Sequence, residues 1–152
     1  MSQSILLVDD EPILLKCIRR LLRPIEKEGV IVWSTTSAEE AIDIISEHPI
    51  DVVVTDQNMN GMSGSELLIW ISEHSPVTRK IVLTGEISLA VALRAINHVG
   101  VDAYLSKPFN NAELLDAVSG ALQTKDRKSR INEIIKESEK SSVQYNKSSS
   151  QP

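Results

Sequence analysis

Short apolar runs alternate along the chain with longer segments of mixed polarity. The runs are rich in valine, isoleucine and leucine, and polar or turn-forming residues follow them, which is typical of strands buried in a parallel sheet. The predicted strands are Ile5–Val8, Val30–Trp33, Asp51–Thr55, Lys80–Thr84 and Ala103–Leu105.

The segments after these runs have apolar residues three and four positions apart, which indicates amphipathic helices. The apolar stripes lie within residues 13–25, 41–45, 67–71, 89–96 and 114–122. Ser37 with Glu40 and Asn110 with Glu113 have the spacing of capping boxes, and Pro12 suits a first helical turn. The alternation predicts an α/β fold, a doubly wound five-stranded parallel sheet with helices on both faces.

The pattern changes after Leu122. Residues 125–140 are charged and contain a small apolar stripe of three isoleucines, which predicts a short amphipathic helix or a linker. Residues 141–152 contain five serines and almost no apolar side chains, so we expect a disordered tail or a linker to a further domain. The globular domain is therefore expected over residues 1–124.

Composition excludes several classes of function. With a net charge of -5 and 3% aromatic residues, the chain lacks the basic surface and the stacking side chains that bind nucleic acid. Cys17 is the one cysteine, which excludes a disulfide framework within the chain, and its place in an apolar helical pattern predicts a core position. Trp33 and Trp70 are predicted to pack in or beside the core. Because no basic segment precedes a long apolar run, we expect a cytoplasmic protein that does not enter a membrane.

Acidic side chains follow two of the predicted strands. Asp56 ends the apolar run that begins at Val52, and Asp9, Asp10 and Glu11 end the first run. In a doubly wound sheet the functional site lies beyond the carboxyl ends of the strands, so these acids are expected at one edge. Crowded carboxylates repel each other and favour a divalent cation, and hard oxygen ligands favour Mg²⁺.

Two further strand ends add a hydroxyl and an ammonium. Thr84 ends the fourth run, and Lys107 follows the fifth. Together with the acids they form the set that phosphoryl transfer to a carboxylate needs: Asp56 as nucleophile, Mg²⁺ and Lys107 to neutralise phosphoryl oxygens, and Thr84 as a hydrogen-bond donor.

With these motifs in order at successive strand ends, the sequence resembles the receiver domains of two-component response regulators over about residues 4 to 122. The motifs are Val8-Asp9-Asp10-Glu11, Asp56 with Met59, Met62 and Gly64, Leu83-Thr84-Gly85, and Lys107-Pro108. The resemblance implies a flavodoxin-like (βα)5 receiver fold with strand order 2-1-3-4-5. It also implies a regulatory phosphoacceptor domain, not an enzyme, although such domains catalyse their own phosphotransfer and dephosphorylation.

The resemblance also implies roles for residues of the site. Asp56 would be the phosphoacceptor, supplied by a sensor histidine kinase or a phosphotransfer protein. Asp10 and Asp56 would bind Mg²⁺ directly, Asp9 through water and Asn58 through its backbone carbonyl.

Three further residues would act on the phosphoryl group or respond to it. Lys107 would pair with the phosphoryl group, and Thr84 and Tyr104 would form the switch pair. Asn58 and Glu86 would flank the path of the attacking water. Small or polar side chains there are similar to those of fast-dephosphorylating chemotaxis receivers, so we expect a short-lived phosphoryl state. One departure from the family pattern is Asn60, which stands where a proline is usual, and we expect a looser loop there.

The mode of output is left open. A stand-alone regulator would bind an effector through the surface around the fourth helix, fifth strand and fifth helix, with Ala90, Arg94, Ala103 and Tyr104 as contributors. Alternatively, the chain is the receiver part of a longer regulator with a fused output domain, and a phosphorylation-dependent homodimer is a third arrangement.

Two rival functions share the sheet topology or the chemistry. A flavin-binding electron carrier needs a phosphate-cradling loop after the first strand, where Asp9, Asp10 and Glu11 would repel a phosphate. An aspartyl-phosphate hydrolase of the haloacid type normally has a second acid two residues after its nucleophile, where this chain has Asn58, and it has a cap domain for which this chain has no room.

Overall fold

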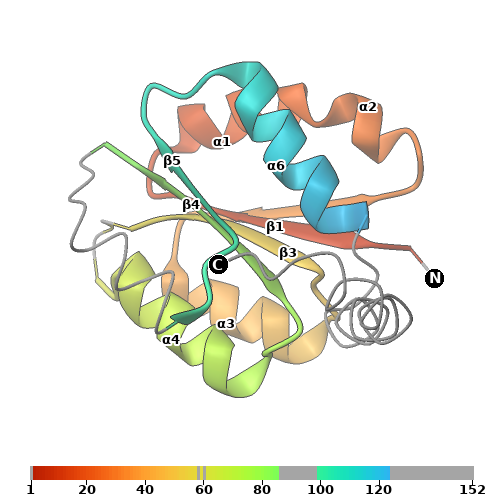
Figure 1. The fold of residues 1–152 in the computed structure, drawn as a ribbon. Helices are drawn as coiled ribbons and strands as arrows, with labels where there is room; N and C mark the ends of the chain where they lie inside the picture. Colours follow the sequence, from red (N-terminus) through yellow and green to blue (C-terminus); the bar gives the residue numbers. More distant parts are fainter. Residues whose placement is uncertain (1, 58, 60, 86–98, 124–152) are drawn as a thin grey trace, which may run out of the picture. The chain divides into compact units, whose positions relative to one another are not determined.

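The computed structural model describes residues 2–57, 59, 61–85 and 99–123 (Figure 1). In these ranges five parallel strands form one sheet in the order β2-β1-β3-β4-β5, which confirms the predicted fold class and strand order. The strands are β1 (Ser4–Val8), β2 (Ile31–Thr35), β3 (Val52–Asp56), β4 (Arg79–Thr84) and β5 (Ala103–Ser106).

Helices cover both faces of this sheet. Figure 1 shows α1, α2 and α6 over one face and α3 and α4 over the other. Their bounds are α1 (Pro12–Leu21), α2 (Arg23–Glu26), α3 (Ala38–Glu47), α4 (Gly64–His74) and α6 (Asn111–Gln123). The helix expected over residues 89–96 lies outside the described residues, as do the segments 125–140 and 141–152.

The helix predicted over residues 13–25 is interrupted at Leu22, the residue between α1 and α2. The cause is Pro24, which has no N–H to donate to the carbonyl four residues earlier and whose ring crowds that carbonyl. The helical segment therefore restarts as a separate short turn.

Side chains fix the starts of three helices. Ser37 Oγ accepts a hydrogen bond from the backbone N–H of Glu40 at 3.2 Å, as the capping box predicts for α3. Asn110 Oδ1 accepts one from the backbone N–H of Ala112 at 2.7 Å at the start of α6. Ser63 Oγ caps α4 in the same way, and these bonds satisfy amides that a helix leaves without internal partners.

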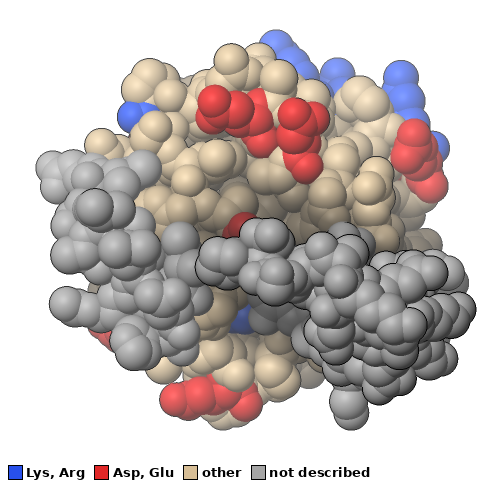
Figure 2. Space-filling view, viewed as in Figure 1, with Lys and Arg blue, Asp and Glu red and all other residues tan. Residues whose placement is uncertain are grey.

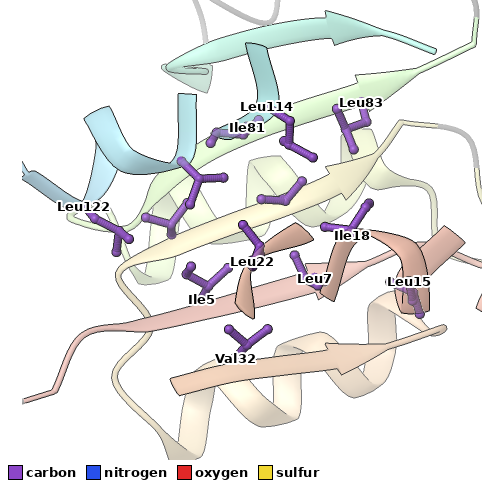
Figure 3. Packing of buried hydrophobic residues seen from close by; sticks show 13 residues of the cluster. Ile5, Leu7, Leu15, Ile18, Leu22, Val32, Ile81, Leu83, Leu114 and Leu122 are labelled. Atoms are coloured by element: carbon purple, nitrogen blue, oxygen red, sulfur yellow. The ribbon is translucent and has the colours of Figure 1, made fainter. Parts of the chain in front are cut away.

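The core consists of two apolar layers, one on each face of the sheet. Along β1, Ile5 and Leu7 pack against α1 and α6, while Leu6 and Val8 pack against α3 and α4. The first layer, shown in Figure 3, includes Ile18, Leu22, Ile81, Leu83 and Leu114. Because alternate side chains of a strand point to opposite faces, a strand covered on both faces must be apolar throughout, which explains the uninterrupted runs in the sequence.

The prediction that Cys17 lies in the core is wrong, since its side chain is exposed. The buried residues of α1 are Leu15 and Ile18, and Cys17 lies beside this stripe without facing the sheet. Trp33 and Trp70 are partly buried against the second layer, as predicted. Each stacks on a histidine, Trp33 on His48 and Trp70 on His74, at centroid distances of 4.4 and 4.5 Å.

The compact unit ends at Leu122, whose carbonyl accepts a hydrogen bond from Gln3 Nε2 at 2.6 Å. Within the described ranges no helix has the length and apolar character needed to cross a bilayer.

Charge is unevenly distributed over this unit. Residues 12–28, in α1, α2 and the turn after them, contain five basic and two acidic side chains, although the whole chain has a net charge of -5. Figure 2 shows Lys and Arg gathered over the part of the surface where α2 lies. Lys16, Arg19, Arg20, Arg23 and Glu26 surround a shallow hollow there.

Candidate functional site

The carboxyl ends of the strands bring the predicted polar residues to one edge of the sheet. Asp9 directly follows β1, Asp56 is the last residue of β3, and these two strands are paired neighbours. Thr84 is the last residue of β4 and pairs in register with Ser106 of β5, one residue before Lys107. The parallel arrangement of the sheet is therefore what brings residues almost a hundred positions apart together.

Four carboxylates meet at this edge. Asp9, Asp10, Glu11 and Asp56 each offer an oxygen, and these oxygens all lie within 4.8 Å of one another. Asp9 and Asp56 are buried, Asp10 is half-buried and Glu11 is exposed. Burial raises the pKa of the Asp9 carboxyl, even though hydrogen bonds from the Lys107 ammonium and the Glu11 N–H act in the opposite direction. The cluster offers hard oxygen donors at a spacing that one small cation can span.

Lys107 joins the acids of two strands. Its Nζ lies 2.8 Å from Asp9 Oδ2 and 2.9 Å from Asp56 Oδ2, with Glu11 Oε1 farther away at 3.6 Å. Burial lowers the pKa of the ammonium as the largest single influence, but the hydrogen bonds and charges of Asp9 and Asp56 together outweigh it, so the pKa is raised. The Lys107 backbone N–H donates to the Thr84 carbonyl at 2.8 Å, which fixes the start of this side chain against β4.

These ion pairs predict a loss of stability at alkaline pH. The folded protein holds the Lys107 proton more tightly than the unfolded chain, so the stabilisation is fully present below the ordinary pKa of 10.5 and is lost as pH rises through the higher folded-state pKa. We expect the thermal midpoint of the metal-free protein to fall more steeply above pH 10.5 in the parent than in Lys107→Met. Lys16→Met, which removes an exposed lysine of α1, should keep the parental slope; an equally steep fall in Lys107→Met would refute the assignment.

Thr84 and Tyr104 lie on neighbouring strands behind the acids. Thr84 is fully buried at the end of β4, and Tyr104 of β5 is half-buried beside Val82 and Leu68. The Tyr104 hydroxyl donates to Gln57 Oε1, and Gln57 Nε2 donates to Ser65 Oγ at 3.1 Å. Burial raises the pKa of the Tyr104 phenol, and the negative charge of Asp56 adds to the shift.

Gln57 was missed by sequence reasoning. The available signal was its position, a polar residue directly after Asp56, but position alone does not say which residue it will contact. The hydrogen bond to Tyr104 joins residues 47 positions apart, and it depends on the β3-β4-β5 register.

Gly64 brings the start of α4 against the backbone of Asp56. A Cβ at this position would lie 1.8 Å from the Asp56 carbonyl oxygen and 2.8 Å from Gln57 Cα. The Gly64 N–H donates to the Gln57 carbonyl at 3.0 Å. This glycine is therefore required by close backbone approach, and it couples the position of Asp56 to the first turn of α4.

Several predicted residues are not located. Asn58, Asn60, Glu86, Ala90 and Arg94 lie outside the described residues. Of the predicted output residues, Ala103 and Tyr104 are described, and both are half-buried on β5.

Comparison with known proteins agrees with this fold. A family model described as response regulator receiver domain matches residues 5–119. The transcriptional regulatory protein YvrH of Bacillus subtilis (strain 168) is 40% identical over 123 residues, which make up 80% of this chain and 50% of YvrH. The chain thus spans half the length of that relative.

Two solved structures extend the similarity to three dimensions. A response regulator receiver domain protein from Clostridium thermocellum has 35% sequence identity and a TM-score of 0.72, covering 81% of this chain and 96% of its own. The signal receiver domain of an HD domain-containing protein from Pseudomonas fluorescens Pf-5 has 32% identity and a TM-score of 0.74, covering 81% of this chain and 96% of its own.

Proposed function

The chain belongs to the response regulator receiver domain family, and on this basis we propose that it is a phosphorylation-activated signalling switch of a two-component system. In this proposal Asp56 accepts a phosphoryl group from a histidine kinase or a phosphotransfer protein in the cytoplasm. The observation that supports it most strongly is the Lys107 ammonium, which contacts the carboxylates of both Asp9 and Asp56. Membership of this family argues against both rival functions, the flavin-binding electron carrier and the haloacid-type hydrolase.

The chemistry assigned to Asp56 is a displacement at phosphorus. A carboxylate oxygen of Asp56 forms the new P–O bond, the P–N bond of the donor phosphohistidine breaks, and the imidazole leaves with the bonding electron pair. Lys107 already contacts one oxygen of Asp56, so its charge is available to a phosphoryl oxygen without a large movement. Thr84 would donate its hydroxyl to another phosphoryl oxygen.

The acidic cluster fits a Mg²⁺ ion by the chemistry of its donors. Asp10 and Asp56 would hold the ion directly, Asp9 through water and Asn58 through its backbone carbonyl. The oxygens of Asp9, Asp10 and Asp56 lie within the 4.8 Å cluster, and all are hard ligands. When bound, Mg²⁺ supplies charge neutralisation for the phosphoryl oxygens.

The response to phosphorylation would involve Thr84 and Tyr104. Movement of the Thr84 hydroxyl toward the phosphoryl group would leave space beside β4, into which the Tyr104 ring would turn. Tyr104 would then lose its hydrogen bond to Gln57. The surface formed by the helix expected over residues 89–96, β5 and α6 would change, and an effector would bind the changed surface.

The direct test is Mg²⁺-dependent phosphorylation of the purified chain by acetyl phosphate, measured by intact mass. We expect a gain of one phosphoryl group with Mg²⁺, no gain in EDTA, and recovery when Mg²⁺ is added in excess of the chelator. No adduct under any condition would refute the proposed function. An adduct that forms equally well in EDTA would refute the role of the metal.

A receiver fused to an output domain is the second candidate. It is favoured by the length of the Bacillus relative, of which this chain spans 50%. In that case the segment after α6 would lead to the effector, and phosphorylation would act within one polypeptide or through a homodimer. Phosphorylation of the receiver domain is common to both candidates, so Mg²⁺-dependent phosphorylation by acetyl phosphate tests each of them.

A further inference from the structure

The acceptor loop joins β3 to α4 over residues 57–63, of which the structure describes Gln57, Met59 and residues 61–63. Two hydrogen bonds anchor the described part of this loop. At its base the Gly64 N–H donates to the Gln57 carbonyl at 3.0 Å. Toward its tip the Met62 N–H donates to Glu39 Oε1 at 3.1 Å, across a sequence separation of 23 residues. The side chains of Met59 and Met62 pack against the second apolar layer. The second anchor is therefore a bond from a different helix, α3, to the loop that follows Asp56.

Glu39 is held in position for this bond. It lies in the first turn of α3, and its Oε2 accepts a hydrogen bond from the hydroxyl of the capping residue Ser37 at 2.9 Å. The backbone N–H of Glu39, the Ser37 hydroxyl and the Met62 N–H, in that order, lower the pKa of this carboxyl, so it stays ionised and remains an acceptor.

Gly61 gives the acceptor loop a left-handed turn beside the Glu39 carboxylate. Gly61 has a φ of +80°, a left-handed conformation that side chains rarely adopt, and a Cβ at this position would lie 3.4 Å from Glu39 Oε1. A residue with a side chain at position 61 would therefore strain the turn, although its Cβ would only be in ordinary contact with the Glu39 carboxylate. This left-handed residue directly precedes Met62, whose N–H donates to Glu39 on α3.

We propose that Glu39 is a positioning residue that fixes the acceptor loop for cation binding beside Asp56. The inference depends on the proposed function, in which the backbone of this loop supplies one ligand to Mg²⁺. Asn60 occupies the position where the family pattern has a proline, so the loop lacks a residue whose ring would fix φ. A bond from outside the loop can supply the missing restraint, because fewer loop conformations then have to be selected when the cation binds.

The experiment compares three variants of the full chain with the parent. Glu39→Ala removes the acceptor, and Glu39→Gln keeps a side-chain oxygen that can accept from Met62. Glu40→Gln is the matched control, because it removes an equal charge from the next residue of the same helical turn. Mg²⁺ affinity is measured by calorimetric titration, and the rate of phosphorylation by acetyl phosphate is measured as a function of Mg²⁺ concentration.

We expect Glu39→Ala to weaken Mg²⁺ binding about threefold to tenfold, the range that loss of one hydrogen bond allows. The Mg²⁺ concentration for half-maximal phosphorylation should rise by the same factor, while the rate at saturating Mg²⁺ stays at the parental value. Glu39→Gln and Glu40→Gln should both remain within twofold of the parent. A merely structural role for Glu39 would lower the thermal midpoint without changing the Mg²⁺ dependence.

Three results would overturn the inference. Parental Mg²⁺ affinity in Glu39→Ala would mean that the bond to Met62 does not position the loop. An equal loss in Glu39→Gln would mean that charge, not the hydrogen bond, is responsible, as would a loss in Glu40→Gln. In each of these cases the parent is still phosphorylated, so the proposed function stands; a parent that neither binds Mg²⁺ nor is phosphorylated would remove both.

Discussion

Asp56→Asn is expected to abolish phosphorylation by acetyl phosphate while the domain stays folded. The amide has the shape of the carboxylate but lacks the anionic oxygen that attacks phosphorus. Lys107 keeps its ion pair with Asp9, at 2.8 Å, so the ammonium is not left unpaired at the edge of the sheet. Removal of one charge from four clustered carboxylates also relieves repulsion, so the thermal midpoint in EDTA should equal or exceed that of the parent.

Intact mass after incubation with acetyl phosphate and Mg²⁺ measures the loss directly. Glu11→Gln serves as the matched control, since Glu11 belongs to the same cluster but is exposed and is assigned no direct role. It should still gain one phosphoryl group. An adduct of equal yield in Asp56→Asn would show that another residue is the acceptor, and the proposed mechanism would then be wrong.

Gly64→Ala is expected to destabilise the fold strongly, although it adds only one methyl group. The new Cβ would be placed 1.8 Å from the Asp56 carbonyl oxygen, and this clash cannot be relieved by a side-chain rotation, because the Cβ position is fixed by the backbone of α4 and the oxygen belongs to the backbone of β3. Relief requires α4 to separate from β3, so we expect the free energy of unfolding in urea to fall by about 3 kcal/mol or more. The same displacement moves Asp56, and phosphorylation should therefore also be slowed in the fraction that remains folded.

Gly120→Ala is the matched control for this substitution. Gly120 lies inside α6, and nothing lies within 4 Å of a Cβ built there. In a helix the same change should raise stability by about 0.5–1 kcal/mol, because alanine loses less conformational entropy on folding than glycine. If the two variants had equal stability, the close approach at Gly64 would not be a real constraint on the fold.

Local patterns were enough to predict the sheet and the acids at its edge. The runs Ile5–Val8 and Val52–Val54 are apolar at every position because β1 and β3 are covered on both faces, and an acid that ends such a run can only lie at a strand end. The order of the strands was predicted from the family resemblance instead, since the alternation of apolar runs and helices does not determine which strands are neighbours.

Contacts between distant segments were beyond the reach of sequence reasoning. A glutamate in the first turn of a helix is common, and nothing at Glu39 indicates a bond to Met62 in a loop 23 residues later. The contact of Gln57 with Tyr104 likewise depends on the register of three strands. The interruption of the first helix at Leu22 could have been predicted from Pro24. The exposure of Cys17 could not, because the apolar residues of α1 are so closely spaced that they do not determine which side of the helix faces the sheet.

The basic side chains over α1 and α2 give the domain an electric dipole. At long range a charged molecule experiences the net charge of -5, but within about 10 Å at 0.1 M salt the nearest charges dominate. An acidic surface that approaches is then attracted to Lys16, Arg19, Arg20 and Arg23 and repelled from the carboxylates at the strand ends. Encounters with charged proteins are thus oriented before contact, and their association rates should depend on ionic strength even where the final affinities do not.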